Sequence, residues 1–259
     1  MKKKMKNIIL DLLSIAVLIC LCFSEYRFVQ EYMKIRKSEK VHDDVVNIVK
    51  ESQPDADPDD GQFHFTKKSW QALKKQNSDF TGWIQWDTGL VSQPFVQTDN
   101  NDYYLTHNIE KQFDYMGAAF MDSDASVFGQ NITIYGHTVF YTGSDGMFTP
   151  LNKLRKQDVL DQNQTFKIYW QNRVASYQVK TVSIVDTGDK NAWQFERHYF
   201  AGSSDVQNWV NEAQSCAETS EPAEVTGDSK FVTLQTCRDP HSNIRVVVLG
   251  VETGSEDYQ

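Results

Sequence analysis

The chain has 259 residues, 40% hydrophobic and 24% charged, which is enough to bury one main core with some appendages. Its formal net charge is −9 at pH 7, and the charge of residues 7–259 is −13 once the four lysines near the start are left out. This acidic balance, without any basic stripe along the chain, excludes a typical nucleic-acid-binding protein.

The first 25 residues differ from the rest of the chain. The start MKKKMK is rich in lysine, and the run IILDLLSIAVLICLCF at residues 8–23 is almost wholly apolar. A helix needs about 20 residues to cross a bilayer, so this run is short, and Asp11 is tolerated best near the lysine-rich interface. A cleaved signal peptide expects small residues before the cut, which LCFSEY lacks. The pattern favours an uncleaved anchor over a signal peptide or a buried core helix.

The same lysines predict the orientation of this anchor. Lysine-rich flanks remain on the cytoplasmic side, so the chain after residue 25 is expected on the outer side. We therefore predict a single-pass protein of the cell membrane with a cytoplasmic N-terminus and an extracellular main domain.

A helical region and a linker follow the anchor. Residues 25–50 are rich in helix formers and contain neither proline nor glycine, which indicates a juxtamembrane helix or helices. The segment ESQPDADPDDGQ at 51–62 is acidic and nearly free of apolar residues, which is typical of a solvated linker. The predicted organisation is an anchor at 1–25, a helical region with its linker at 26–67, and a folded domain at 68–259.

Short runs rich in β-branched and aromatic residues begin with GWIQWD at 82–87 and recur toward the C-terminus. In ASYQVKT, Tyr177, Val179 and Thr181 alternate with polar residues, which predicts a strand with one wet face. The preceding QNR at 171–173 has the composition of a hairpin turn. About eight such strands, with few helices between them, predict a mainly β protein, either a barrel or a sandwich.

Two helices are expected to interrupt the strands. One covers 149–162, after a proline, and the other covers 204–218, where Ser204 is a candidate cap. The second helix would carry Cys216 as a core thiol. Cys20 and Cys22 lie in the anchor, so Cys216 and Cys237 are the cysteines of the main domain. Their positions favour reduced thiols, although one Cys216–Cys237 bridge is compatible with the sequence.

The segment FVTLQTCRDPHSNIRVVVLG at 231–250 carries the strongest chemical signal. A strand-like run ends at Cys237, a loop rich in turn residues follows, and a second strand-like run contains Arg245. If the two strands pair antiparallel, side chains on neighbouring positions lie about 5 Å apart. The guanidinium would then reach the sulfur or a group attached to it. Such a fork suits a substrate carbonyl or the oxyanion formed by thiolate attack.

A nucleophilic cysteine also needs a proton carrier. His137 is the best candidate among the six histidines, because NITIYGH ends a strand-like run and places the imidazole at a strand end or loop. The other histidines lie in the N-terminal region, in polar or helix-like contexts, or in the loop after Cys237. A structural role is the alternative for each.

The combination of TLQTC, an arginine in the next strand and an upstream GH at a strand end resembles the sortase family. The resemblance covers about residues 68–252 and implies an eight-stranded β-barrel, with N-terminal helices and a helix before the last two strands. It also implies that Cys237, His137 and Arg245 are the catalytic residues. The implied activity is that of a cysteine transpeptidase (EC 3.4.22 type) without a metal or cofactor.

Within the family, NSDFTGWIQW and QPFVQTDNNDYYLTHN are most similar to class B sortases of Gram-positive bacteria. The resemblance implies cleavage of a C-terminal sorting signal after threonine through a thioester, and transfer of the protein to a peptidoglycan precursor or another cell-wall amine. It suggests Asn101 and Leu105 as groove residues, with loop and core packing as the alternative. Residues 186–196 would grip the sorting peptide, with Trp193 where the family more often has tyrosine.

Competing enzyme classes fit less well. Cys237 closes a strand and lacks the C-G-S-C-W setting of papain-like proteases. The loop before Arg245 has no glycine for a phosphate-binding turn and contains Asp239. Cys237 and His241 lack a second ligand pair for zinc. The remaining alternative is a membrane-anchored, non-enzymatic β-barrel binding module in which Cys237 is a small buried hydrophobic residue.

Overall fold

The computed structural model describes residues 2–52, 63–140 and 145–257. The chain divides into two compact units, Met1–Lys40 and Val41–Gln259. Most of the predicted acidic linker, residues 53–62, lies outside the described residues. The elements, in chain order, are α1 (Lys2–Glu51), α2 (Lys67–Gln76), β1 (Phe80–Trp86), β2 (Ser92–Val96), η1 (Tyr103–Leu105), β3 (Ala119–Met121), β4 (Asn131–Tyr135), η2 (Thr149–Arg155), α3 (Gln157–Leu160), β5 (Thr165–Tyr169), β6 (Arg173–Asp186), α4 (Ser203–Ser215), β7 (Ala217–Ser220), β8 (Phe231–Cys237) and β9 (Ile244–Asp257).

The described residues of the first unit, from Lys2 onward, are helical. The helix expected over residues 25–50 is confirmed, because α1 continues without a break to Glu51. The N-terminal part of α1 contains a window with a mean hydropathy of 2.3, none of it buried. By length and composition this helix is able to cross a membrane.

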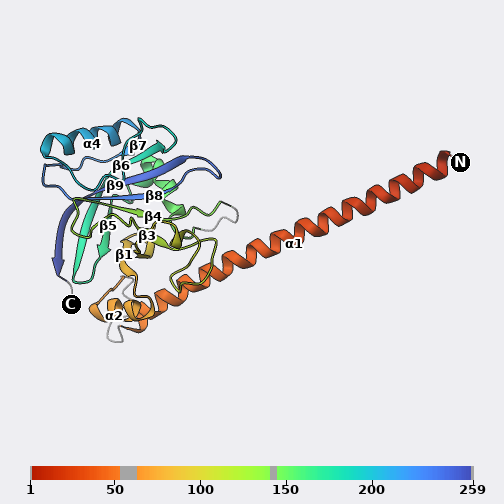
Figure 1. Cartoon of the computed structure of the whole chain (residues 1–259), viewed down its shortest axis with the longest axis horizontal. Helices are drawn as coiled ribbons and strands as arrows, with labels where there is room; N and C mark the ends of the chain where they lie inside the picture. The colour runs from red at the N-terminus through yellow and green to blue at the C-terminus, as the bar shows by residue number, and fades with distance from the viewer. Residues whose placement is uncertain (1, 53–62, 141–144, 258–259) are drawn as a thin grey trace. The chain divides into compact units, whose positions relative to one another are not determined.

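The second unit is built on a closed barrel. Eight strands are hydrogen-bonded in the order β5-β1-β2-β3-β4-β8-β9-β6, and pairing of β6 with β5 closes the ring. β7 adds to the outer edge of β6 as a ninth strand. The predicted β-barrel is therefore confirmed, and the sandwich alternative is wrong. Figure 1 shows the barrel with α4 and β7 at one end and α2 at the other.

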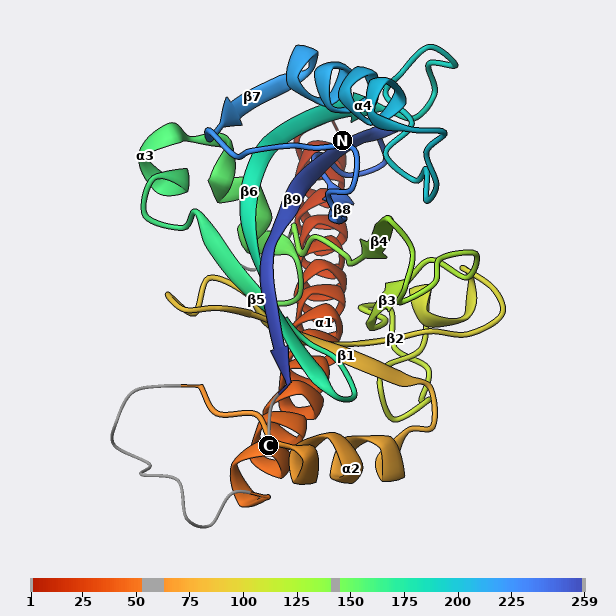
Figure 2. The same ribbon diagram turned by 90° about the vertical axis from the view of Figure 1, so that its left-hand side faces the viewer.

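Two pairs of neighbours in the barrel are parallel. β2 pairs with β3, and β4 pairs with β8 in register from Asn131↔Phe231 to Tyr135↔Gln235. Parallel neighbours need long connections, and the chain between β4 and β8 contains further strands and helices that cover the barrel. The two long strands β6 and β9 curve side by side along the barrel (Figure 2). This topology brings the C-terminal ends of β4 and β8 to the same edge.

The barrel interior is a continuous apolar core. The rings of Trp86 and Phe166 stack with centroids 4.3 Å apart, and both side chains are fully buried. On β6, Tyr177 and Val179 point inward while their polar neighbours are half-exposed, as the alternating pattern predicted. The hairpin at residues 171–173 is also confirmed, since Trp170 N donates to Arg173 O.

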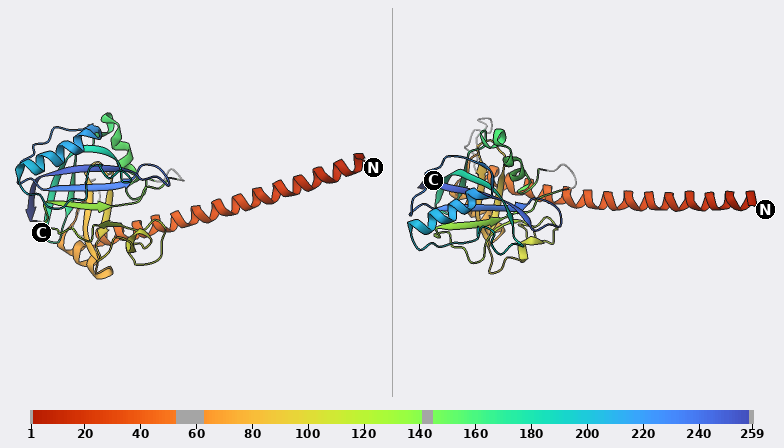
Figure 3. Two further views of the ribbon diagram at one scale, coloured as in Figure 1. Left: turned by 45° about the horizontal axis from the view of Figure 1, so that its top comes forward. Right: turned by 90° about the horizontal axis from the view of Figure 1, so that it is seen from above.

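Two layers pack on the outside of the barrel. α4 places Val206, Trp209 and Val210 over the outer face of β8 and β9, where they meet Val247 and Leu249. Figure 3 shows this helix, in lighter blue, lying along the C-terminal strands. On the opposite side α2, capped by Thr66, and the end of α1 cover β1 through a second apolar cluster. The helix that the resemblance implied before the last two strands is α4.

The structure corrects the sequence prediction in two places. The helix expected over 204–218 ends at Ser215, because residues 217–220 pair with β6 as strand β7. Ser204 is not its cap, since the helix begins after Gly202 without a side-chain cap. The region 149–162 forms a 3-10 helix followed by the short helix α3. In both regions, pairing and packing with distant strands override the local helix pattern.

Candidate active site

Three strand ends place Cys237, Arg245 and His137 together at one edge of the barrel. Cys237 is the last residue of β8 and lies opposite Arg245 in the antiparallel pair with β9. Gly136 N donates to Gln235 O at 3.0 Å, so the parallel pairing of β4 with β8 continues up to His137. All three side chains are partly exposed. The antiparallel pair expected from the sequence is thus present, and the histidine at the adjoining strand end is beside it.

The imidazole of His137 is held by the backbone of a distant segment. Its Nε2 atom lies 3.0 Å from the carbonyl oxygen of Leu105, which can only accept a hydrogen bond. Nε2 therefore carries a proton in this arrangement, and Nδ1 is the ring nitrogen that can exchange a proton with another group. The backbone nitrogen of His137 also donates to Met147 Sδ at 3.3 Å. Leu105 thus contacts the site through its backbone, while its side chain is 39% exposed.

The backbone of Cys237 is fixed by polar side chains that the sequence analysis missed. Thr138 Oγ1 donates to Cys237 O at 2.7 Å, and Asn152 Nδ2 donates to the same oxygen at 3.2 Å. The buried Thr236 donates to Gly136 O at 2.7 Å, so it links β8 to β4. The only available signal in the sequence was that Thr138 follows His137. No hydrogen bond within the described residues joins the thiol of Cys237 to another side chain, which leaves the sulfur accessible for chemistry.

Arg245 supports the loop between β8 and β9. Its Nη1 atom donates to Ser242 O at 2.7 Å and to Ile244 O at 3.3 Å. Within the described residues, the Nε and Nη2 atoms of Arg245 donate no hydrogen bond to the protein. Nε and Nη2 therefore remain able to donate hydrogen bonds to an anionic or carbonyl oxygen. The planar guanidinium directs these two donors side by side.

The other cysteine of the second unit has a different environment. Cys216 caps the end of α4, and its thiol donates to the carbonyls of Glu212 and Ala213. Burial raises the pKa of the Cys216 thiol, which keeps it protonated and poorly nucleophilic. Cys216 and Cys237 are both free thiols, as the sequence favoured.

The residues proposed from the sequence to contact substrate lie in different environments. Asn101 accepts a hydrogen bond from Ser123 N at 2.8 Å and belongs to the segment that carries Leu105. Trp193 is only 5% exposed, and its ring centroid lies 5.2 Å from that of Trp209 beneath α4. The structure brings Leu105 to His137 but places Trp193 in the core, below the surface of its segment.

Gly136 allows the close packing behind His137. A Cβ atom at this position would lie 2.6 Å from the ring of Phe148, which is fully buried. We expect Gly136→Ala to destabilise the protein by about 1–3 kcal/mol, as overpacking of a core does, and to lower activity by displacing His137. Urea unfolding measures the stability effect. Gly254→Ala is the matched control, because nothing lies within 4 Å of the position that its methyl group would take, and the expected change is within about 0.5 kcal/mol. Equal stability of the two variants would contradict this packing argument.

The chain is similar to known proteins of one family. Residues 89–253 match the family model of the sortase domain. Sortase B of Staphylococcus aureus is 25% identical over 248 residues, which cover 93% of this chain and 95% of that protein. Sortase B of Listeria monocytogenes is 26% identical over 168 residues, which cover 64% of this chain and 65% of that protein.

Solved structures share the fold. The Staphylococcus aureus sortase B–substrate complex superposes with a TM-score of 0.72 at 22% identity, covering 85% of this chain and 98% of that one. Clostridium perfringens sortase B gives a TM-score of 0.65 at 24% identity, covering 71% and 100%. The family model spans more than half of the chain and includes both His137 and the Cys237–Arg245 pair. The chain therefore belongs to the sortase family, and among sortases it is most similar to those named sortase B.

Proposed function

We propose that this protein is a class B cysteine transpeptidase, anchored in the membrane of a Gram-positive cell. It cleaves a C-terminal sorting signal after threonine and transfers the protein to a peptidoglycan amine. The observation that carries the proposal is the meeting of Cys237, Arg245 and His137 at one edge of a sortase barrel. One solved structure with this fold is a sortase B–substrate complex, and we extend the binding of a substrate to this protein.

The reaction uses the three side chains in sequence. The Cys237 thiolate attacks the threonine carbonyl, and the free donors of Arg245 stabilise the oxyanion. Protonated His137 gives its Nδ1 proton to the leaving amine while Nε2 stays on the Leu105 carbonyl. A thioester between Cys237 and the substrate remains. Nδ1 then takes a proton from the incoming cell-wall amine, which attacks the thioester carbonyl and releases Cys237 as the thiolate, so the starting pair of thiolate and protonated imidazole is restored.

Two chain segments flank this edge and are proposed to form the substrate groove. One contains Asn101 and Leu105, and the other is the segment at 186–196 between β6 and α4. Trp193 contributes by anchoring the second segment in the core beneath α4. Polar side chains and backbone groups on the surface of the two segments would then contact the sorting peptide.

Mass spectrometry of the full chain in detergent tests the proposal directly. The protein is incubated with a library of short peptides that contain a central threonine, without an amine acceptor, and is quenched in acid. We expect a mass increase on the peptide containing Cys237 that corresponds to an acyl fragment ending in threonine. Addition of an amine should remove it. An unmodified Cys237 with every peptide, together with slow alkylation of its thiol, would favour a non-enzymatic binding module.

The proposed topology makes a separate prediction. Residues 1–25 form the cytoplasmic tip and anchor, 26–67 the juxtamembrane region and linker, and 68–259 the extracellular catalytic domain. In intact cells stripped of their wall, added protease is expected to digest the chain beyond residue 25, because the lysines hold the N-terminus inside. Immunoblotting against N- and C-terminal tags measures this. Full protection of the C-terminal tag, with digestion after lysis, would show the reverse orientation.

A further inference from the structure

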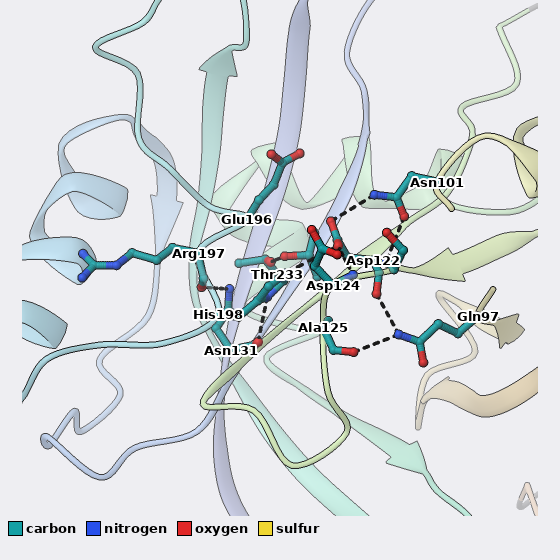
Figure 4. A network of polar contacts seen from close by, with 12 residues as sticks. Gln97, Asn101, Asp122, Asp124, Ala125, Asn131, Glu196, Arg197, His198 and Thr233 are labelled. Atoms are coloured by element: carbon teal, nitrogen blue, oxygen red, sulfur yellow. Dashed lines mark hydrogen bonds and ion pairs between the residues drawn. The ribbon is translucent and has the colours of Figure 1, made fainter. Parts of the chain in front are cut away.

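A buried carboxylate lies between the two segments that flank the candidate active site. Asp122 follows β3 directly, and its side chain is 9% exposed. Tyr135, on β4 two residues before His137, donates its hydroxyl proton to Asp122 Oδ2 at 2.5 Å. Asp124 N donates to Oδ1 at 2.9 Å. These contacts fix the carboxylate on the outer side of the barrel, next to the strand that leads to His137 (Figure 4).

On one side the carboxylate contacts the segment that carries Leu105. Asn101 Nδ2 lies 3.4 Å from Asp122 Oδ2, and Asn101 Oδ1 accepts from Ser123 N at 2.8 Å. Both the Nδ2 and the Oδ1 atoms of Asn101 therefore contact the turn after β3. Leu105, four residues further along the same segment, holds Nε2 of His137.

On the other side the carboxylate contacts the segment between β6 and α4. His198 Nε2 lies 3.6 Å from Asp122 Oδ1, while His198 Nδ1 lies 3.1 Å from Asn131 O. Glu196, in the same segment, lies 3.0 Å from the Tyr135 hydroxyl. The Tyr135 hydroxyl has one proton, so it donates mainly to Asp122, which is the nearer of the two carboxylates. Figure 4 shows Asn101 beside Asp122 on one side and the segment that carries Glu196, Arg197 and His198 on the other.

Hydrogen bonds join the backbone of this second segment to β4 and β8. Asn131 Nδ2 donates to the carbonyls of Phe195 and Arg197 at 2.9 Å each, and Thr233 Oγ1 donates to Phe195 O at 3.2 Å. Residues 195–198 therefore cross the outer faces of β4 and β8, in line with His137 and Cys237 at the ends of those strands. The bonded positions, Asn131 and Thr233, precede His137 and Cys237 along the same two strands.

We propose that Asp122 is a positioning residue that sets the spacing of the two groove segments by holding Asn101 on one side and His198 on the other. The inference rests on the proposed function of the edge as a peptide groove. Asp122 does not touch the reacting atoms. Its effect is on substrate binding, through the placement of residues 195–198 and of the segment that ends at Leu105.

The tie between Asp122 and His198 depends on pH. The ion-pair contact with Asp122 at 3.6 Å raises the pKa of His198 above its ordinary value of 6.5, helped by Asn131 O and the charge of Asp124. Asp122 keeps its charge: burial raises its pKa, but the contact with His198 and the hydrogen bonds from Tyr135 and the Asp124 amide outweigh burial and lower the pKa to about 2. Glu196 and Tyr135 are the other titratable groups that face the pair. The pKa of His198 is higher in the folded than in the unfolded protein. The contact of protonated His198 with Asp122 therefore stabilises the folded protein fully below about pH 6.5, and this stabilisation is lost as pH rises through the raised pKa.

Substitution of Asp122 tests the positioning role. In Asp122→Asn we expect KM for the best-cleaved peptide of the library to rise about tenfold, because the substitution removes one interaction with a charged group. We expect kcat to change less than about twofold. The rate of Cys237 alkylation should be unchanged. Asp124→Asn is the matched control, since it removes a nearby charge without removing a side-chain bond to His198, and its KM should stay within about twofold. An equal KM for Asp122→Asn and wild type would overturn the proposal.

The pH dependence is measured in the full chain carrying Cys237→Ala, so that neither catalysis nor the thiol contributes. Binding of the same peptide, followed by fluorescence anisotropy, should weaken about fivefold between about pH 6 and about pH 9 as His198 loses its proton. His198→Gln keeps an N–H donor without titrating, so its affinity should be independent of pH in this range. A pH dependence retained in full by His198→Gln would refute the role of the pair, even if Asp122→Asn fails to fold.

Hydrogen–deuterium exchange separates this inference from the proposed function, because it needs no peptide. At about pH 7, Asp122→Asn is expected to speed amide exchange in peptides covering residues 195–200 by about tenfold, while exchange in β8 and β9 is unchanged. Faster exchange in a protein that cleaves no peptide would support the tie and reject the transpeptidase. Unchanged exchange in an active enzyme would reject the tie alone.

Discussion

Replacement of Cys237 with alanine is expected to abolish peptide cleavage, lowering kcat/KM by at least about 10⁴-fold. The thiolate is the only group at the edge of β8 that we propose to form a covalent bond with the substrate. The fold should not suffer, because the hydrogen bonds of Thr138 and Asn152 reach the Cys237 carbonyl and remain in the variant. Chromatography of the cleaved peptide measures activity, and circular dichroism measures the melting midpoint.

Cys216→Ala is the matched control for this experiment. Cys216 is the other cysteine of the second unit, and its thiol donates to helix carbonyls at the end of α4. We expect its variant to keep activity within about twofold, with at most a modest loss of stability from the smaller side chain. Cleavage by Cys237→Ala at a rate near that of wild type would exclude the proposed thioester mechanism.

Arg245→Lys is expected to lower kcat/KM by about 10²-fold or more, which corresponds to roughly 3 kcal/mol for one well-aimed oxyanion donor. The arginine uses Nη1 to hold Ser242 O and Ile244 O, so its remaining donors are directed from a fixed plane. A lysine keeps the charge but presents one rotating ammonium, which cannot hold the loop and an oxyanion at the same time. A fluorogenic peptide measures turnover, and iodoacetamide measures the alkylation rate of Cys237.

Two outcomes distinguish the possible roles of this arginine. A large fall in turnover with unchanged alkylation supports the oxyanion role. If Arg245 acted only by its charge on the thiol, lysine would restore turnover to within about threefold, since exposed charge pairs contribute roughly 0–1 kcal/mol. Arg238→Lys is the control, because Arg238 lies in the same loop, pairs with Asp239 and is 37% exposed. We expect its turnover to stay within about twofold.

Much of the fold was predictable because its signals are local. The alternation around Tyr177 and Val179 marks a strand with one buried face, and the turn at 171–173 marks a hairpin. The pairing of Cys237 with Arg245 also follows from two strand-like runs joined by one short loop. Helix boundaries were less predictable, since β7 forms only because β6 offers its edge to residues 217–220.

The sequence by itself therefore determined the apolar first helix, the β-rich second unit and the pairing of the TLQTC strand with the strand that carries Arg245, because each depends on neighbours along the chain. Only the tertiary structure decided that β4 lies parallel to β8, which brings His137 beside a cysteine 100 residues away. It also decided that Leu105 holds the imidazole and that Asp122 lies between two distant segments. These contacts depend on the closed barrel, because burial of the strand faces selects which distant segments become neighbours.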